Sequence, residues 1–214
     1  MCLFLDDGIL DMRKISIYTL FLTLTLSGLA QSPYTRPEKK WAFFHPLAAI
    51  KVKHIASKCQ PLYLTCLSRL RPDTFLTGGA PDALRHGFFM AAFAQSIRPS
   101  ALIKLGKAHE KGNYLQWRST KTEDGNFADS LLCVMDLYNN KKGCSLGAAN
   151  KKASMKELLE ICMRELKTGG FVILKRDKRA CRVYCDNQPV DMIVYYGTWN
   201  IPGCLVASDY RYMD

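Results

Sequence analysis

The sequence lacks several features that would assign it to a functional class. It has no run of about 18 or more apolar residues, which excludes a bundle of membrane-spanning helices. It contains no CxxC pair and no HExxH motif, so neither a cysteine zinc site nor a zincin protease is indicated. Its 14 glycines and 9 prolines are ordinary numbers, which excludes collagen-like and low-complexity chains. No basic strand with interleaved aromatic residues is present, and we therefore expect no nucleic-acid partner.

What the chain does contain is enough apolar material for a packed core. Hydrophobic residues make up 48% of the 214 residues and aromatic residues 11%, which excludes wholesale disorder. The 30 Lys and Arg residues outnumber the 19 Asp and Glu residues, giving a net charge of +11. This charge is compatible with an anionic partner, such as an anionic envelope polymer or lipid head groups.

Residues 1–30 are predicted to hold a secretory signal peptide. Arg13 and Lys14 provide the positive charge, and residues 15–26 form an apolar stretch of the length found in such leaders. Small residues then allow cleavage after Ala30. Cleavage would leave a chain with no transmembrane segment.

Residues 1–11 fit this leader poorly because they carry three acidic residues ahead of its positive charge, which indicates that translation starts at Met12. Whether residues 1–11 are translated stays open. We expect export through the inner membrane to the periplasm or the outside of the cell. Residues 31–41 are predicted to be a connector, and residues 42–214 a single domain.

The cysteines agree with an exported chain. Eight of the nine follow the leader, and an even number in an oxidising compartment is compatible with disulfides. Short loops bring their ends together often, which favours the local pairs Cys59–Cys66 and Cys181–Cys185. Eight cysteines leave many other pairings open.

Hydrophobic periodicity predicts an α+β fold, with a mainly helical body and a small antiparallel β piece at the C-terminus. Asp82 is the predicted N-cap of one helix and Ser154 that of another, with Glu157 completing a capping box. The predicted helices are 42–58, 62–70, 83–97, 101–110, 127–142 and 155–167, and the predicted strands are 171–175, 181–185 and 192–196.

Polar residues interrupt the apolar pattern of three helices, in the stretches DALRHGFF (82–89), GKAHEKGNY (106–114) and MDLYNNKKG (135–143). In this order they resemble the signatures of a family of secreted bacterial proteins annotated only as a domain of unknown function. Similar signatures occur in some toxin-like secreted bacterial proteins. The resemblance covers roughly residues 70–150 and implies no established activity. The chain departs from this family pattern at Gly87 and Phe88, where bulkier aromatic residues are expected after the Arg-His pair.

The signature residues are candidates for a site between three helices. Such a set could perform general acid–base hydrolysis of an envelope or extracellular substrate, with a carboxylate orienting a histidine that activates water. It could instead hold a divalent metal, and whether one binds stays open. The candidate catalytic residues are His86, His109, Glu110 and Asp136, and the candidate binding residues are Arg85, Asn139 and Asn140.

The alternative is a non-catalytic binding or structural module. In this interpretation Asp136 pairs with Arg85, the asparagine amides cap helix ends, and the histidines are satisfied within a buried polar network. The network would then specify the arrangement of the helices.

Overall fold

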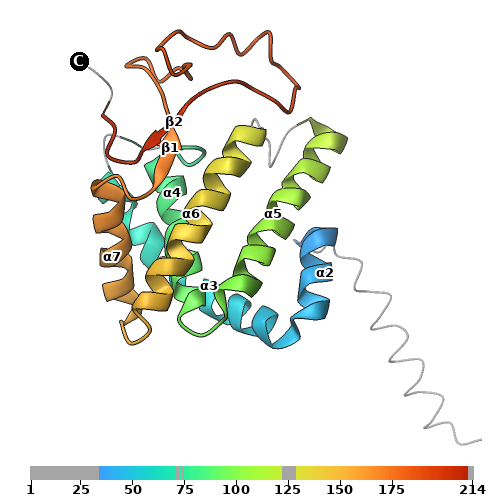
Figure 1. The fold of residues 1–214 in the computed structure, drawn as a ribbon, viewed down its shortest axis with the longest axis vertical. Coiled ribbons are helices and arrows are strands. Elements are labelled where there is room, and N and C mark those ends of the chain that lie inside the picture. The colour runs from blue at the N-terminus through green and yellow to red at the C-terminus, as the bar shows by residue number, and fades with distance from the viewer. Residues whose placement is uncertain (1–33, 71–72, 74, 122–128, 212–214) are drawn as a thin grey trace, which may run out of the picture. The chain divides into compact units, whose positions relative to one another are not determined.

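The computed structural model describes residues 34–70, 73, 75–121 and 129–211. The predicted signal peptide and the predicted start at Met12 lie outside the described residues. Residues 35–214 form one compact unit. Its described part contains six α-helices followed by a two-stranded antiparallel sheet, which confirms the predicted fold class (Figure 1). The elements are α2 Arg36–Phe44, α3 Pro46–Cys66, the short 3-10 helix η1 Leu67–Leu70, α4 Ala80–Ala94, α5 Pro99–Thr120, α6 Ser130–Ala149, α7 Met155–Lys167, β1 Val172–Leu174 and β2 Leu205–Ala207.

Helix α4 is the central element of the core. Leu84, Phe88 and Ala91 are fully buried, and the helix packs against α3, α5, α6 and α7. Side chains of α3 and α7 complete the larger apolar cluster, and Cys59 of α3 is fully buried within it. Since α4 carries one of the predicted signatures, its burial fixes the position of that signature.

Helices α4 and α6 approach each other closely along a row of small residues. A Cβ atom on Gly143 would overlap the carbonyl group of Gly87, and one on Gly147 would overlap that of Ala91. Gly87 itself faces the ring of Phe171, which fills the space that a side chain would need.

Two helices are longer than predicted. The sequence predicts helix ends near Gly112 and Gly143, but α5 and α6 both continue beyond these positions. Each glycine marks a close contact instead of a helix end, since a Cβ atom on Gly112 would overlap the side chain of Thr35. Trp117, predicted in a loop, consequently lies on α5.

The N-terminal helices also differ from the prediction. α2 begins at Arg36, within the expected connector, where Thr35 and Glu38 form a capping box. α3 runs through Pro61 without interruption, in place of the two predicted helices. The capping box of Ser154 on α7 is confirmed.

Helix α4 begins at Ala80, three residues earlier than predicted. Asp82 therefore lies in the first turn and is not the N-cap. Its Oδ2 atom accepts a hydrogen bond of 2.7 Å from the backbone N–H of Gly78, in the loop before the helix.

Of the three predicted strands, one is confirmed and two are wrong. β1 lies within the predicted 171–175 and pairs with β2, which the sequence did not indicate, so that Ile173 faces Val206. Residues 181–185 make only isolated bridges, such as Val183 with Pro189. Residues 192–196 form turns and leave Ile193 87% exposed, so their apolar character does not reflect a sheet.

Both predicted disulfides are wrong. Cys185 is bonded to Cys204, while Cys59, Cys66 and Cys181 are free thiols. Cys59 and Cys66 are seven residues apart on one helix, about 10 Å along its axis, which is too far for a disulfide. Proximity in sequence predicted the wrong pair because both residues lie on the same rigid helix, which keeps them apart.

The C-terminal segment is anchored to the helical body by two buried arginines. Arg182 forms a 2.5 Å ion pair with Asp129, the N-cap of α6, and both side chains are buried. Arg176 donates hydrogen bonds to the carbonyl oxygens of Thr77 and Gly78, just before α4. These contacts hold the first turns of α4 and α6, the two helices that carry most of the candidate site.

The α4–α6 contact can be tested with Gly143→Ala. On an exposed helix this change would stabilise the protein by about 1 kcal/mol. Because the added methyl would overlap the Gly87 carbonyl, we expect destabilisation of about 2 kcal/mol instead, measured by urea unfolding. Ser145→Ala, at an exposed position of the same helix, is the matched control and should change stability by less than about 0.5 kcal/mol. Equal effects of the two substitutions would contradict the close contact.

Candidate functional site

Three signature residues converge between α4 and α6. Asp82 and His86 lie one turn apart on α4, and Asp136 faces them from α6. The Nε2 atom of His86 is 3.5 Å from Oδ1 of Asp82 and 3.4 Å from Oδ1 of Asp136. One possible ligand atom from each residue lies within 4.8 Å of those of the other two residues. All three side chains are mostly buried, with at most 11% of their surface exposed. We call these residues the Asp82–His86–Asp136 cluster.

Asn140 fixes the orientation of the His86 ring. It lies one turn after Asp136 on α6, and its Oδ1 atom is 3.2 Å from Nδ1 of His86. An amide oxygen accepts a hydrogen bond, so this contact assigns the proton of a neutral ring to Nδ1. Nε2 then carries the lone pair, and it lies beside the two carboxylates and the Arg85 guanidinium group.

Burial keeps the His86 ring neutral. Loss of solvent lowers the pKa of His86 from 6.5 to about 4, and the carboxylate of Asp82 offsets only part of this effect. A neutral imidazole whose Nε2 lies beside two carboxylates is a suitable ligand for a cation.

Arg85 supplies one positive charge at the edge of the cluster. Its Nη2 atom donates a 2.7 Å hydrogen bond to Oδ1 of Asp82 and lies 3.3 Å from Nε2 of His86. The side chain is half-exposed, at 48%, whereas the side chain of Asp82 is 3% exposed. The guanidinium group therefore has room to move toward solvent while Asp82 stays in place.

His109 on α5 lies beside the cluster and not in it. Its ring centroid is 6.5 Å from that of His86. Its Nδ1 atom is 2.9 Å from Oε1 of Glu38 on α2, a residue that the sequence signatures did not include. Burial of Glu38 alone would raise the pKa of its carboxyl group, but hydrogen bonds from His109 and Thr35 outweigh burial and lower it.

Glu110 and Asn139 form hydrogen bonds with residues outside the cluster. Glu110 is buried on α5 and accepts a 3.2 Å hydrogen bond from Nδ2 of Asn113; burial raises the pKa of its carboxyl group. Asn139 is fully buried and exchanges two hydrogen bonds with the backbone of Val172, the first residue of β1. Asn139 thus holds the sheet on α6.

One comparison with known proteins gave a match. The family described as a domain of unknown function (DUF6973) matches residues 39–170 of this chain. The chain belongs to this family. The DUF6973 region runs from α2 to the end of α7, so it includes the whole cluster and ends before β1. The search of curated proteins and the search of solved structures each gave no match.

The sequence pattern indicates His86, Asp136 and Asn140 as site residues but predicts Asp82 as a helix cap. The signal that could have identified Asp82 is its spacing of four residues from His86, which puts both side chains on one helical face. Glu38 could not have been found in this way, because it is 71 residues from His109 in the chain.

Among the described residues, no helix has the length and apolar character needed to cross a membrane.

The low pKa of His86 makes stability depend on pH. Between pH 6.5 and about 4 the unfolded chain binds a proton at this residue and the folded chain does not. The contribution of His86 to the free energy of unfolding is therefore fully present above pH 6.5. It is lost as the pH falls through about 4, by roughly 3 kcal/mol in total.

We expect urea unfolding in the presence of a chelator to detect this loss in the wild-type protein. His86→Gln should remove most of this pH dependence, whereas His54→Gln, at an exposed position, should retain it. If both variants keep the wild-type pH profile, His86 is not the buried neutral group described above.

Proposed function

We propose that the Asp82–His86–Asp136 cluster binds a divalent cation and that the protein is a cation-dependent hydrolase. The observation that carries this proposal is the position of His86 Nε2, which lies 3.4 and 3.5 Å from two carboxylate oxygens of Asp136 and Asp82. Three negative or electron-rich atoms so close together repel one another, and a cation between them removes the repulsion.

The distances from His86 to the two carboxylates support a metal ion. Ligands about 2.0–2.1 Å from a tetrahedral ion lie about 3.3–3.4 Å apart, close to the two distances from His86 Nε2. Two carboxylates and one imidazole suit Mn²⁺ or Zn²⁺ and leave positions for water or substrate. The hydrogen bond from His86 Nδ1 to Asn140 is the outer contact that metal-bound histidines usually make.

The surrounding residues have distinct roles in this proposal. An ion at the cluster would lower the pKa of a bound water and so provide a nucleophile at neutral pH. Arg85, released from Asp82, would bind the negative charge that develops on the substrate. His109, oriented by Glu38, lies beside the cluster and would take up or donate a proton.

The hydrolase is proposed to act outside the cytoplasm. The predicted leader and the Cys185–Cys204 disulfide support export to the periplasm or beyond, because disulfides persist in oxidising compartments. The net charge of +11 favours an anionic substrate, such as an anionic envelope polymer or lipid head groups.

A second candidate is a non-catalytic module in which the same residues form a structural network. The observation that favours it is the position of the Arg85 guanidinium group, which neutralises Asp82 and contacts His86. In this case Arg85 takes the place of the cation. The two candidates differ in whether the protein binds a metal ion.

Calorimetric titration of chelator-treated protein with Mn²⁺ distinguishes them. Mn²⁺ is preferred to Zn²⁺ because the free thiol of Cys181 is exposed and would bind zinc. We expect one ion per chain, and Asp136→Asn should weaken its binding by about a hundredfold or more. Asp191→Asn, which alters an exposed carboxylate outside the cluster, is the control and should bind as the wild type does.

Absence of Mn²⁺ binding, with normal unfolding of the wild-type protein, would favour the structural network. Hydrolysis is tested separately with chromogenic ester and phosphodiester substrates in the presence of Mn²⁺. Turnover that depends on Asp136 supports the hydrolase. Metal binding without turnover of any substrate would contradict the hydrolase and retain only the metal site.

A further inference from the structure

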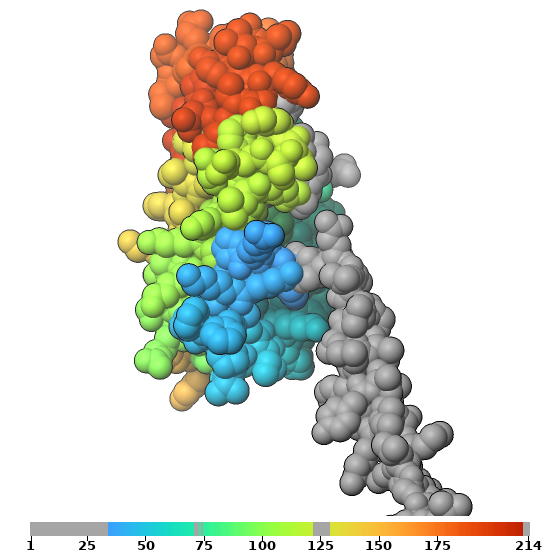
Figure 2. All heavy atoms as spheres, turned by 90° about the vertical axis from the view of Figure 1, so that its right-hand side faces the viewer, coloured from blue at the N-terminus to red at the C-terminus, as the bar shows by residue number. Residues whose placement is uncertain are grey.

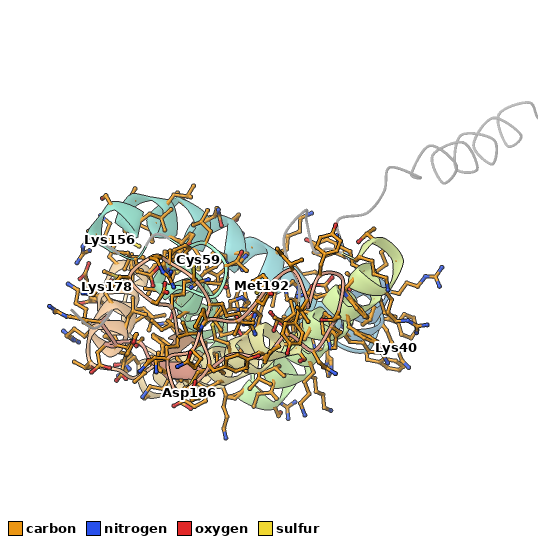
Figure 3. The ribbon with its side chains drawn as sticks, turned by 90° about the horizontal axis from the view of Figure 1, so that it is seen from above. Lys40, Cys59, Lys156, Lys178, Asp186 and Met192 are labelled. Carbon is orange, nitrogen blue, oxygen red and sulfur yellow. A yellow bond between two sulfur atoms is a disulfide. The ribbon has the colours of Figure 1, made fainter. Side chains whose placement is uncertain are left out.

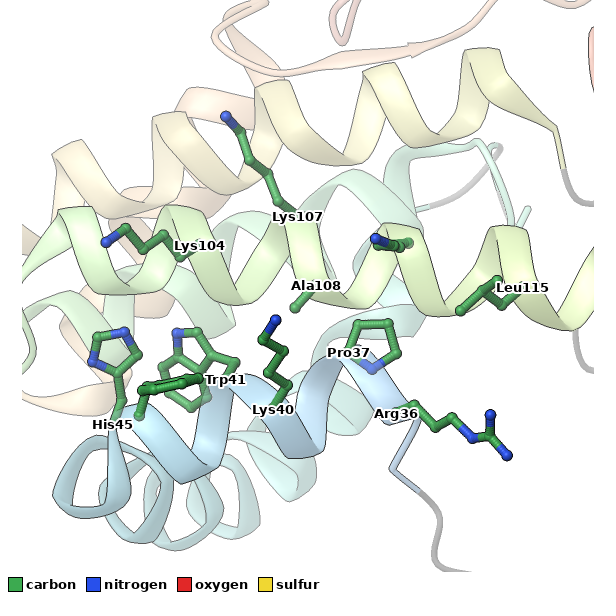
Figure 4. A pocket seen from close by; sticks show the side chains of 11 residues that line it. Arg36, Pro37, Lys40, Trp41, His45, Lys104, Lys107, Ala108 and Leu115 are labelled. Atoms are coloured by element: carbon green, nitrogen blue, oxygen red, sulfur yellow. The ribbon is translucent and has the colours of Figure 1, made fainter.

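A groove lined by cations lies between α2 and α5, and none of the cluster residues lines it. It has a volume of about 610 Å³, and Trp41, Ala108 and Leu115 form apolar parts of its wall. Lys40 extends into it from α2, and Lys104 and Lys107 flank it on α5 (Figure 4). The cations that line it are Arg36, Lys40, Lys104, Lys107 and Lys111.

These five cations have no acidic partner in the part of the chain that the structure describes. None of them takes part in an ion pair with a described residue, and no acidic residue lines the groove. All five are exposed. Like charges on facing helices repel one another, so an anion bound between α2 and α5 would relieve this repulsion.

Beside the groove, the corner between α2 and α3 exposes four large apolar side chains within eight residues. They are between 65% and 79% exposed, and Phe44 also lines the groove. The rings of Phe43 and Phe44 contact each other edge to face, with centroids 5.3 Å apart. The space-filling view of Figure 2 has α2 and the start of α3, in blue, on the face toward the viewer beside α5, in green. The four residues are Phe43, Phe44, Leu47 and Ile50.

From this combination we infer that the α2–α5 groove and the α2–α3 corner dock the protein on a membrane surface of anionic phospholipid. Exposed aromatic and aliphatic side chains partition into the boundary between head groups and acyl chains, and adjacent lysines bind anionic head groups. The groove receives a lipid phosphate, while the corner inserts. Trp41 is 7% exposed and donates its indole N–H to the Ala101 carbonyl, so it forms the groove wall and is not a platform for stacking bases.

The test is co-sedimentation of the full chain with vesicles. One set contains phosphatidylcholine alone, and the other contains phosphatidylcholine with an equal amount of phosphatidylglycerol. We expect binding to the second set and little to the first. Lys104→Glu with Lys107→Glu should reduce this binding on the order of tenfold or more.

A matched charge reversal separates the groove from net charge. Lys152→Glu with Lys156→Glu changes the net charge equally on exposed residues, and Lys156 lies at the opposite end of the molecule from Lys40 in the view of Figure 3. We expect this variant to retain most of the binding. Equal losses in the two double variants would overturn the inference, because binding would then follow net charge alone.

The apolar corner is tested in the same assay. Phe43→Ser with Phe44→Ser should weaken binding to the phosphatidylglycerol vesicles by several-fold, whereas Ile193→Ser with Val194→Ser, another exposed apolar pair, should not. If only the lysine substitutions matter and inorganic phosphate competes, the groove binds a soluble anion and the membrane assignment is wrong. Failure of the wild-type protein to sediment would also overturn it, independently of the proposed metal site.

Discussion

Helices α4 and α6 pack with their backbones in close contact, and this contact positions the candidate ligands. Gly143 and Gly147 let the two backbones approach closely, so that side chains about two turns before Gly143 meet α4 across the interface. Asp82 and His86 on α4 consequently reach Asp136 on α6, within 4.8 Å. A larger separation of the two helices would leave Asp136 out of reach of Asp82 and His86. The same packing that builds the core therefore brings the candidate ligands together.

The C-terminal segment supports this contact from outside the DUF6973 region. Phe171 packs against Gly87, and Asn139 binds the backbone of β1, so the sheet covers one side of the α4–α6 pair. Arg176 holds the loop whose Gly78 N–H binds Asp82. The segment after α7 is thus connected to the first turn of α4 through the hydrogen bonds of Arg176 and Gly78. The α2–α5 groove lies apart from these contacts, which allows docking and chemistry to be tested separately.

The sequence predicted the fold class and most helices because apolar periodicity reports burial directly. It misplaced the ends of α5 and α6. A single sequence does not distinguish a glycine that ends a helix from a glycine that allows close packing within a helix. Of the site it indicated His86, Asp136 and Asn140. It missed the role of Asp82, which depends on where α4 begins, and the pairing of His109 with Glu38, which depends on how α2 packs. Contacts between distant segments cannot be derived from local patterns.

In the proposed site, a metal ion lies between α4 and α6 and takes over the neutralising role of the Arg85 guanidinium group. Crystals of the protein grown with Mn²⁺ can be examined by anomalous X-ray scattering. We expect a strong anomalous peak about 2.0–2.2 Å from Asp82, His86 and Asp136, with Arg85 turned toward solvent. A map without this peak, in which Arg85 still contacts Asp82 and His86, would contradict the metal site and leave a structural network.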